Sequence, residues 1–175
     1  MPSTLVARLF LCLLPLFTLA ATARALASVP SFNIVQLALS LPSLSTFAKC
    51  IAAANLTDAL SAAGPFTVFA PSNAAFAKVD PQQLQYLLQH RDALLRVLLL
   101  HVAPGDYTSN QLHDHQVLVT KLGTNGTLTI GIASAVVYVE VTHSNATDFA
   151  RVVTADQMAT NGVIHTADTL LIPKP

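Results

Sequence analysis

The sequence predicts an α+β fold, with helices in its first part and mostly antiparallel strands in its second. Before Pro104 the apolar residues recur mainly at helical spacing. After Gly105 they alternate with polar residues or form β-branched runs, and turn residues separate these runs. Segregated helices and strands are typical of α+β domains rather than of doubly wound parallel sheets. A chain of 175 residues has room for one such domain.

Residues 1–27 have the pattern of a secretory signal peptide. Arg8 precedes an apolar run, and small residues follow this run up to Ala27. The run, residues 9–20, is shorter than the roughly 20 residues of a membrane-spanning helix, and Pro15 interrupts it. We therefore expect cleavage after Ala27, no membrane span in the mature chain, and a secreted protein located in the cell wall or matrix.

The first helical region covers residues 33–60, and Pro42 divides it into at least two helices. Ser43 and Ser45 are available as caps of the second helix. Cys50 lies within its apolar pattern and is expected to be a small buried side chain rather than a reactive thiol.

A short apolar run, residues 66–70, predicts a strand that leads directly into a helix. Pro71 and Ser72 stand at the junction, and Ser72 has the position of an N-cap. The alternative interpretation is a nucleophilic serine with His165 and Asp168 as partners. A nucleophile elbow requires glycines around the serine, and none is present, so the cap is favoured.

Two further helices are predicted before the strands begin. Asp80 and Pro81 start the first, and residues 93–102 form the second, which is apolar nearly all round and therefore central to the core. His101 lies at its end, and we expect a hydrogen-bonded core histidine there.

Turn signals divide the second part of the chain into strands. Asn125-Gly126 and Asn161-Gly162 are strong hairpin signals. The predicted strands are QVLVTKL (116–122), TLTIGIA (127–133), AVVYVEV (135–141) and FARVVTA (149–155).

The remaining motifs predict no catalytic, metal or cofactor site. His113 and His115 lie at i and i+2, but no third ligand is evident, so an exposed polar turn is favoured. His165 is expected on the strand face opposite Ile164, in a structural role. The junction after residue 70 lacks the glycines and lysine of a phosphate loop.

Composition also excludes some partners and indicates a modification. Nine basic and nine acidic residues give a formal charge of zero, with no basic stripe for nucleic acid. Little charge repulsion would oppose weak self-association. The sequons Asn55-Leu-Thr, Asn125-Gly-Thr and Asn145-Ala-Thr predict N-glycosylation in a eukaryotic host.

Three stretches, taken in order, resemble the fasciclin-type (FAS1) domain. These are GPFTVFAPSNAAF (64–76), LLLHVAPGDYTSNQL (98–112) and ATNGVIHTADTLLIP (159–173). The resemblance covers nearly all of the mature chain and implies a single domain over residues 31–173. The implied fold packs N-terminal helices on a β-sandwich or wedge of about seven strands. It implies structural roles for Thr67, Phe69, Pro71, Ser72, Phe76, His101, Gly105, Tyr107, Asn161, Gly162, Val163, Ile164 and His165.

The resemblance further implies a secreted adhesion or matrix module that binds proteins or polysaccharides without catalysis. Adhesive animal relatives commonly have a Tyr before the central His, where this chain has Leu100. They can also present an Asp-Ile pair implicated in integrin binding, where this chain has Asp156-Gln157. Asp156 and Gln157 are therefore candidate partner contacts that differ from the integrin-binding pair.

Two other functions are compatible with the composition. The high aliphatic content and a charged fraction of 10% suggest a carrier of a small apolar ligand, which would need a pocket lined by aliphatic side chains. A secreted hydrolase would need Ser72, His165 and Asp168 within hydrogen-bond reach of one another.

Overall fold

The computed structural model of the chain describes residues 30–123, 126–142 and 147–173. The expected signal peptide, residues 1–27, and the sequon residues Asn125 and Asn145 lie outside the described residues. Among the residues that are described, no single helix is long and apolar enough to cross a membrane. One pair, Ile34–Ser40 with Pro42–Ala53, passes that test only together and is bent by 105°.

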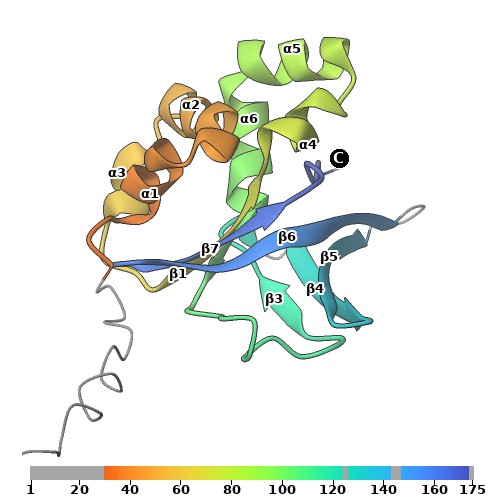
Figure 1. The fold of residues 1–175 in the computed structure, drawn as a ribbon. Helices are drawn as coiled ribbons and strands as arrows, with labels where there is room; N and C mark the ends of the chain where they lie inside the picture. Colours follow the sequence, from red (N-terminus) through yellow and green to blue (C-terminus); the bar gives the residue numbers. More distant parts are fainter. Residues whose placement is uncertain (1–29, 124–125, 143–146, 174–175) are drawn as a thin grey trace, which may run out of the picture.

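The helices occupy the first part of the described chain, as predicted, and lie together on one side of the molecule (Figure 1). Proline and capping residues separate them, since Pro42 and Pro81 stand at helix starts. The helical segments are α1 (Ile34–Ser40), the 3₁₀ turn η1 (Pro42–Leu44), α2 (Ser45–Ala53), α3 (Thr57–Ser61), α4 (Asn73–Ala77), α5 (Pro81–Gln89) and α6 (Arg91–Leu100).

Seven strands form one mixed sheet in the order β2-β1-β7-β6-β5-β4-β3. β1 and β7 are parallel, and every other neighbouring pair is antiparallel. The predicted α+β architecture with about seven mostly antiparallel strands is confirmed. The strands are β1 (Phe66–Pro71), β2 (Val102–Pro104), β3 (Val117–Val119), β4 (Thr127–Ala133), β5 (Val136–Thr142), β6 (Thr147–Ala159) and β7 (Gly162–Ala167).

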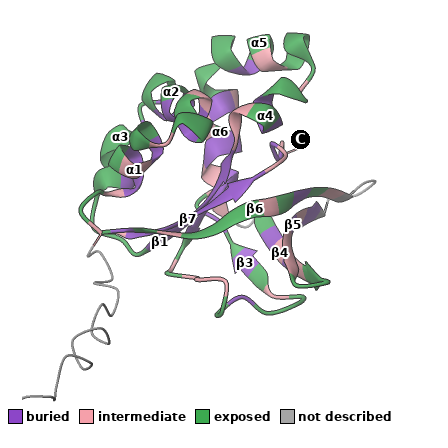
Figure 2. Ribbon diagram, viewed as in Figure 1, coloured by how far each residue is buried: buried purple, intermediate pink, exposed green. Residues whose placement is uncertain are grey.

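Two hydrophobic cores lie on opposite faces of the β1–β7 pair. Val68 and Ile164 belong to the first core, which the helices cover. Phe69 and Ala167 belong to the second, which they share with β3, β4, β5 and β6. Figure 2 shows β1 and β7 buried along their length between these layers. Parallel strands that are buried on both faces have nearly continuous apolar sequences, since no side chain on them reaches solvent.

The structure corrects two predicted elements. The last helix ends at Leu100 rather than Val102, because Val102–Pro104 pairs with β1 as a strand. The predicted strand 116–122 is only β3, because the chain turns at Thr120, whose hydroxyl donates to the carbonyl of Gly126 at 2.6 Å.

The start of α2 is capped from elsewhere in the chain. Neither Ser43 nor Ser45 is its N-cap, contrary to expectation, and Leu44 at that position offers no side-chain cap. The side chain of Asn73 instead accepts from the N–H of Thr46 at 3.0 Å and donates to the carbonyl of Pro42 at 2.8 Å. Asn73 therefore joins the β1–α4 junction to the first helices.

The Asn161-Gly162 signal marks the β6–β7 hairpin, which is formed as predicted. Asn161 also connects this hairpin to the helices, since its side chain accepts from the N–H of Ile34 and donates to the carbonyls of Leu60 and Ala62. Gly162 has a φ of 150°, and a Cβ there would lie 1.9 Å from the carbonyl oxygen of Phe66. Only glycine fits this contact between the hairpin and β1.

Candidate functional site

A cleft of about 430 Å³ lies where the end of α4, the start of α5, the start of β6 and the segment after β7 meet. Its volume lies within the range of about 300–1,000 Å³ that is usual for small-ligand sites. Phe149 on β6 and Gln83 on α5 are exposed, whereas Ala75 and Leu170 are buried. The full lining is Ala75, Lys78, Val79, Asp80, Gln83, Asp148, Phe149, Thr169, Leu170 and Ile172.

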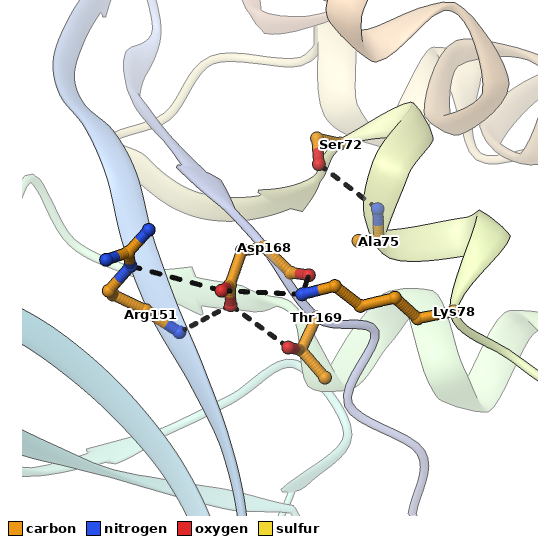
Figure 3. Close-up of polar contacts among 6 residues, drawn as sticks. All are labelled: Ser72, Ala75, Lys78, Arg151, Asp168 and Thr169. Atoms are coloured by element: carbon orange, nitrogen blue, oxygen red, sulfur yellow. Dashed lines mark hydrogen bonds and ion pairs between the residues drawn. The ribbon is translucent and has the colours of Figure 1, made fainter.

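Asp168 holds three of these elements together beside the cleft (Figure 3). It follows β7 and continues the pairing with β6, since its carboxylate accepts from the N–H of Arg151 at 2.9 Å and its N–H donates to the Arg151 carbonyl at 3.0 Å. Lys78, just after α4, donates to the Asp168 carbonyl at 2.9 Å and lies 3.5 Å from its carboxylate. The Thr169 hydroxyl donates to the same carboxylate at 3.0 Å.

These contacts keep Asp168 ionised. Partial burial by itself would raise the pKa of this carboxyl group, but the hydrogen bonds from Arg151 and Thr169 and the charge of Lys78 outweigh that effect. The pKa of Asp168 is therefore lowered. Its charge is matched by Lys78 and by the side chain of Arg151 at 3.9 Å.

The lining of the cleft is mixed in character. Buried apolar side chains alternate with Lys78, Asp80, Gln83 and Thr169, so it lacks the uniformly aliphatic lining expected for a carrier of an apolar ligand. Asp80 caps α5 by accepting from the N–H groups of Gln82 and Gln83.

The proposed hydrolase triad is not assembled among the described residues. The Ser72 hydroxyl accepts from the N–H of Ala75 at 3.2 Å and caps α4, as predicted from the sequence. The Asp168 carboxylate contacts Lys78, Arg151 and Thr169, and in Figure 3 the Ser72 hydroxyl is joined to Ala75 and not to Asp168. The His165 ring has partners on other segments, so these three groups cannot act as nucleophile, base and orienting acid in this arrangement.

His165 lies instead in a buried network between β1, β7 and the loop after β2. The Thr67 hydroxyl donates to the carbonyl of Gly105 and accepts from the N–H of Tyr107, both at 2.9 Å. The His165 ring lies 2.8 Å from the Tyr107 carbonyl through Nε2 and stacks on Phe69 with centroids 5.4 Å apart. His165 thus faces the second core while Ile164 faces the first, as predicted.

Asp156 and Gln157, the candidate partner contacts, both make internal contacts at a bulge of β6. The Asp156 carboxylate accepts from the N–H and hydroxyl of Ser109. Its own N–H donates to Nδ1 of His165 at 3.3 Å, which leaves Nε2–H to donate to Tyr107. The Gln157 amide donates to the Thr166 hydroxyl at 3.0 Å, while its own carbonyl oxygen is buried and has no hydrogen-bond partner among the described residues.

His101 is a hydrogen-bonded core histidine, as predicted. It is fully buried, its Nδ1 lies 2.8 Å from the Val97 carbonyl, and its Nε2 accepts from the N–H of Leu171 at 3.2 Å. Burial lowers the pKa of His101 to about 4, against a weaker opposing effect of the Val97 carbonyl. The ring is therefore neutral and connects α6 to the segment after β7.

The other predicted residues lie as follows. Phe76 and Cys50 are buried in the first core, and burial raises the pKa of the Cys50 thiol. His113 and His115 are exposed in a turn, and the described residues contain no group of three or more His, Cys, Asp or Glu side chains placed to hold a metal ion. Asn55 is exposed in a turn with a φ of 57°.

Comparison with known proteins identifies the family. The fasciclin domain model matches residues 42–173. The chain belongs to the fasciclin domain family. It is 36% identical to protein sll1483 of Synechocystis over 82% of this chain and 74% of that protein. It is 34% identical to the uncharacterized protein sll1735 of the same strain over 80% of this chain and 97% of that protein.

Larger proteins contain similar segments. Human periostin is 30% identical over 74% of this chain, which corresponds to 14% of periostin. Among solved structures, a FAS1 domain pair from the insect cell adhesion molecule fasciclin I matches with a TM-score of 0.67 and 22% identity. That match covers 82% of this chain and about half, 52%, of the fasciclin I chain. It shows that the two proteins share the fold.

The cleft of this fasciclin domain was not predicted from the sequence, because its residues come from separate elements. Among the residues that line the cleft, only Phe149 had a feature in the sequence that could have indicated the site. In the run FARVVTA it alternates with the buried Ala150 and shares a strand face with Arg151, so an aromatic residue falls at an outward position. Lys78, Gln83 and Thr169 have no motif of their own.

Proposed function

We propose that this fasciclin domain is a secreted adhesion or matrix module that acts by contact with an extracellular protein or polysaccharide, without catalysis. The observation that carries the proposal is the exposed apolar surface of the antiparallel strands. Val117, Val119, Phe149 and Val153 each expose more than half of their surface. Exposed valine and phenylalanine side chains on one face of a sheet are typical of contact surfaces.

These residues share one face of the sheet. Val117 pairs with Thr129, Thr129 with Glu140, and Glu140 with Phe149, so one cross-strand row runs from β3 to β6. The intervening residues on these strands, such as Leu118 and Ala150, are buried in the second core. The structural relative named as a cell adhesion molecule supports an adhesive role for the shared fold.

The proposed module extends over residues 31–173. Helix α1 precedes the matched segment 42–173, yet Ile34 and Ala38 are fully buried in the first core. Secretion is supported by the signal-peptide pattern in residues 1–27, and glycosylation by the sequon at Asn55, whose side chain is exposed.

The test is to express the full chain in a eukaryotic secretory host and to recover it from the medium. Retention in the cytoplasm would contradict the proposal, whereas an N-terminus at Ser28 and loss of mass on glycan removal would support it. The recovered protein is then immobilised and exposed to purified matrix proteins and cell-wall polysaccharides, and binding is measured by interferometry.

We expect saturable binding that falls by about tenfold or more when Phe149 and Val153 are both changed to Ser. The matched control is Leu39→Ser, because Leu39 is 67% exposed on α1, away from the sheet. Equal losses in both variants, or no saturable partner, would contradict the proposal. A co-purifying apolar molecule, detected by native mass spectrometry without any such partner, would favour a carrier.

A further inference from the structure

The cleft at the start of β6 is lined by an aromatic residue that belongs to neither hydrophobic core. Phe149 lines the cleft and is 61% exposed, whereas the buried phenylalanines Phe47, Phe69 and Phe76 are at most 5% exposed. An exposed ring in a concave site offers an apolar face to a flat ligand. The C–H face of a sugar ring is such a surface, since its hydroxyl groups project from the edge of the ring.

The lining of the same cleft also contains polar side chains that suit the hydroxyl groups of a sugar. The side-chain amide of Gln83 has no partner among the described residues and carries both a donor and an acceptor. The Thr169 hydroxyl donates to Asp168, so its lone pairs stay available as acceptors. Lys78 is a donor that its two contacts with Asp168 hold in place. Hydroxyl groups of a saccharide both donate and accept, so this mixed set suits them.

The charges of the cleft argue against an anionic ligand. Its only cation among the described lining residues, Lys78, is paired with Asp168, whereas Asp80 contributes a carboxylate. A phosphate or uronate would meet this carboxylate, and the described lining offers no unpaired cation to bind it. A lipid would leave the charged and amide groups without partners.

We propose that this cleft binds a neutral oligosaccharide, with Phe149 stacked on a sugar ring and Gln83, Thr169 and Lys78 hydrogen-bonded to its hydroxyl groups. This inference rests on the proposed extracellular function and names the ligand class for one surface of the module.

The experiment is a titration of the isotopically labelled secreted protein with cellotriose and with triacetylchitotriose, followed by NMR. With probe up to about 10 mM, a Kd of about 1 mM is measurable. We expect saturable shifts confined to the cleft, including the Gln83 side-chain amide and the backbone of Phe149. Trigalacturonate is the anionic comparison, and stronger binding of this probe would overturn the assignment to neutral sugars.

Variants then locate the site. Phe149→Ala should weaken binding of the responding trisaccharide by about tenfold or more, because it removes an aromatic contact residue, while Phe149→Tyr should retain binding. Leu88→Ala is the matched control, because Leu88 is 53% exposed on α5, which borders the cleft, but does not itself line it. An unchanged Kd in Phe149→Ala, or no shifts in the cleft with either neutral probe, would overturn the proposal. If neutral sugars fail while a matrix protein still binds saturably, only the sugar site is wrong; if both fail, the proposed function fails too.

Discussion

The parallel pair β1–β7 and the antiparallel strands β3 to β6 use the same sheet in opposite ways. Every residue of β1 and of β7 is buried, because helices cover one face and the second core covers the other. In the β3 to β6 region one face is buried and the other exposes valine and phenylalanine side chains. The comparison indicates that β1 and β7 carry the stability of the fold, whereas the outward face of β3 to β6 is free to vary with the partner.

The largest effect is expected for Gly162→Ala, where β7 begins beside β1. A methyl group would lie 1.9 Å from the Phe66 carbonyl oxygen, so one strand must move. We expect a loss of about 4 kcal/mol or more in the free energy of unfolding, measured with urea. Gly123→Ala is the matched control, because Gly123 also has a positive φ, 83°, but has open space around it. Similar losses in both variants would show that backbone conformation rather than the β1 contact is responsible.

A second test removes a side chain from the first core. Phe76 is 5% exposed and packs where α4 meets the other helices. Phe76→Ala should lower the free energy of unfolding by about 3–5 kcal/mol, because it removes buried surface and leaves a cavity. A loss below about 1 kcal/mol would place Phe76 outside the core.

The third effect is a dependence of stability on pH that originates in two buried histidines, His101 and His165. The pKa of His101 is about 4 in the folded protein, below its ordinary value of 6.5. The unfolded chain therefore binds the proton more tightly, so stability is full above pH 6.5 and decreases as the pH falls toward 4, by about 3 kcal/mol for this residue. Burial also lowers the pKa of His165, which adds to the loss in the same direction.

Urea unfolding between pH 7.5 and 4.5 would measure this dependence in the full chain and in two variants, within the range where histidines titrate. His101→Gln should flatten the curve, although it also lowers stability at neutral pH. Leu39→Ser, at an exposed position of α1 that has no titratable side chain, should leave the curve unchanged. Equal slopes in all three proteins would contradict the assignment to His101.

The sequence predicted those parts of the fold that depend on local chemistry. Ser72 and Asp80 are N-caps because each is followed by the helix whose N–H groups it accepts from, and such a pattern is visible in a few residues. The alternation after Gly105 predicted β4 and β5 within about one residue of their ends. The helical and strand regions were therefore assigned correctly.

Features that depend on distant partners were not predicted. Asn73 caps a helix whose first N–H groups lie 27 residues earlier, and β2 is a strand only because it pairs with β1. The cleft has the same origin, because Gln83, Phe149 and Thr169 meet only after the sheet and helices have packed. No local pattern encodes these juxtapositions, which explains why the fold was predicted better than the candidate site.

The smallest expected effect on stability falls on the exposed face and completes the comparison. Phe149→Ser should change the free energy of unfolding by less than about 0.5 kcal/mol, because the ring is 61% exposed and is not part of either core. The same substitution should remove most of the binding to a saccharide or matrix partner, whereas Phe76→Ala should mainly lower stability. A stability loss near that of Phe76→Ala would mean that Phe149 belongs to the packing of the fold. Separate effects of these two phenylalanines on stability and on binding would assign folding to the buried core and recognition to the exposed face of the antiparallel strands.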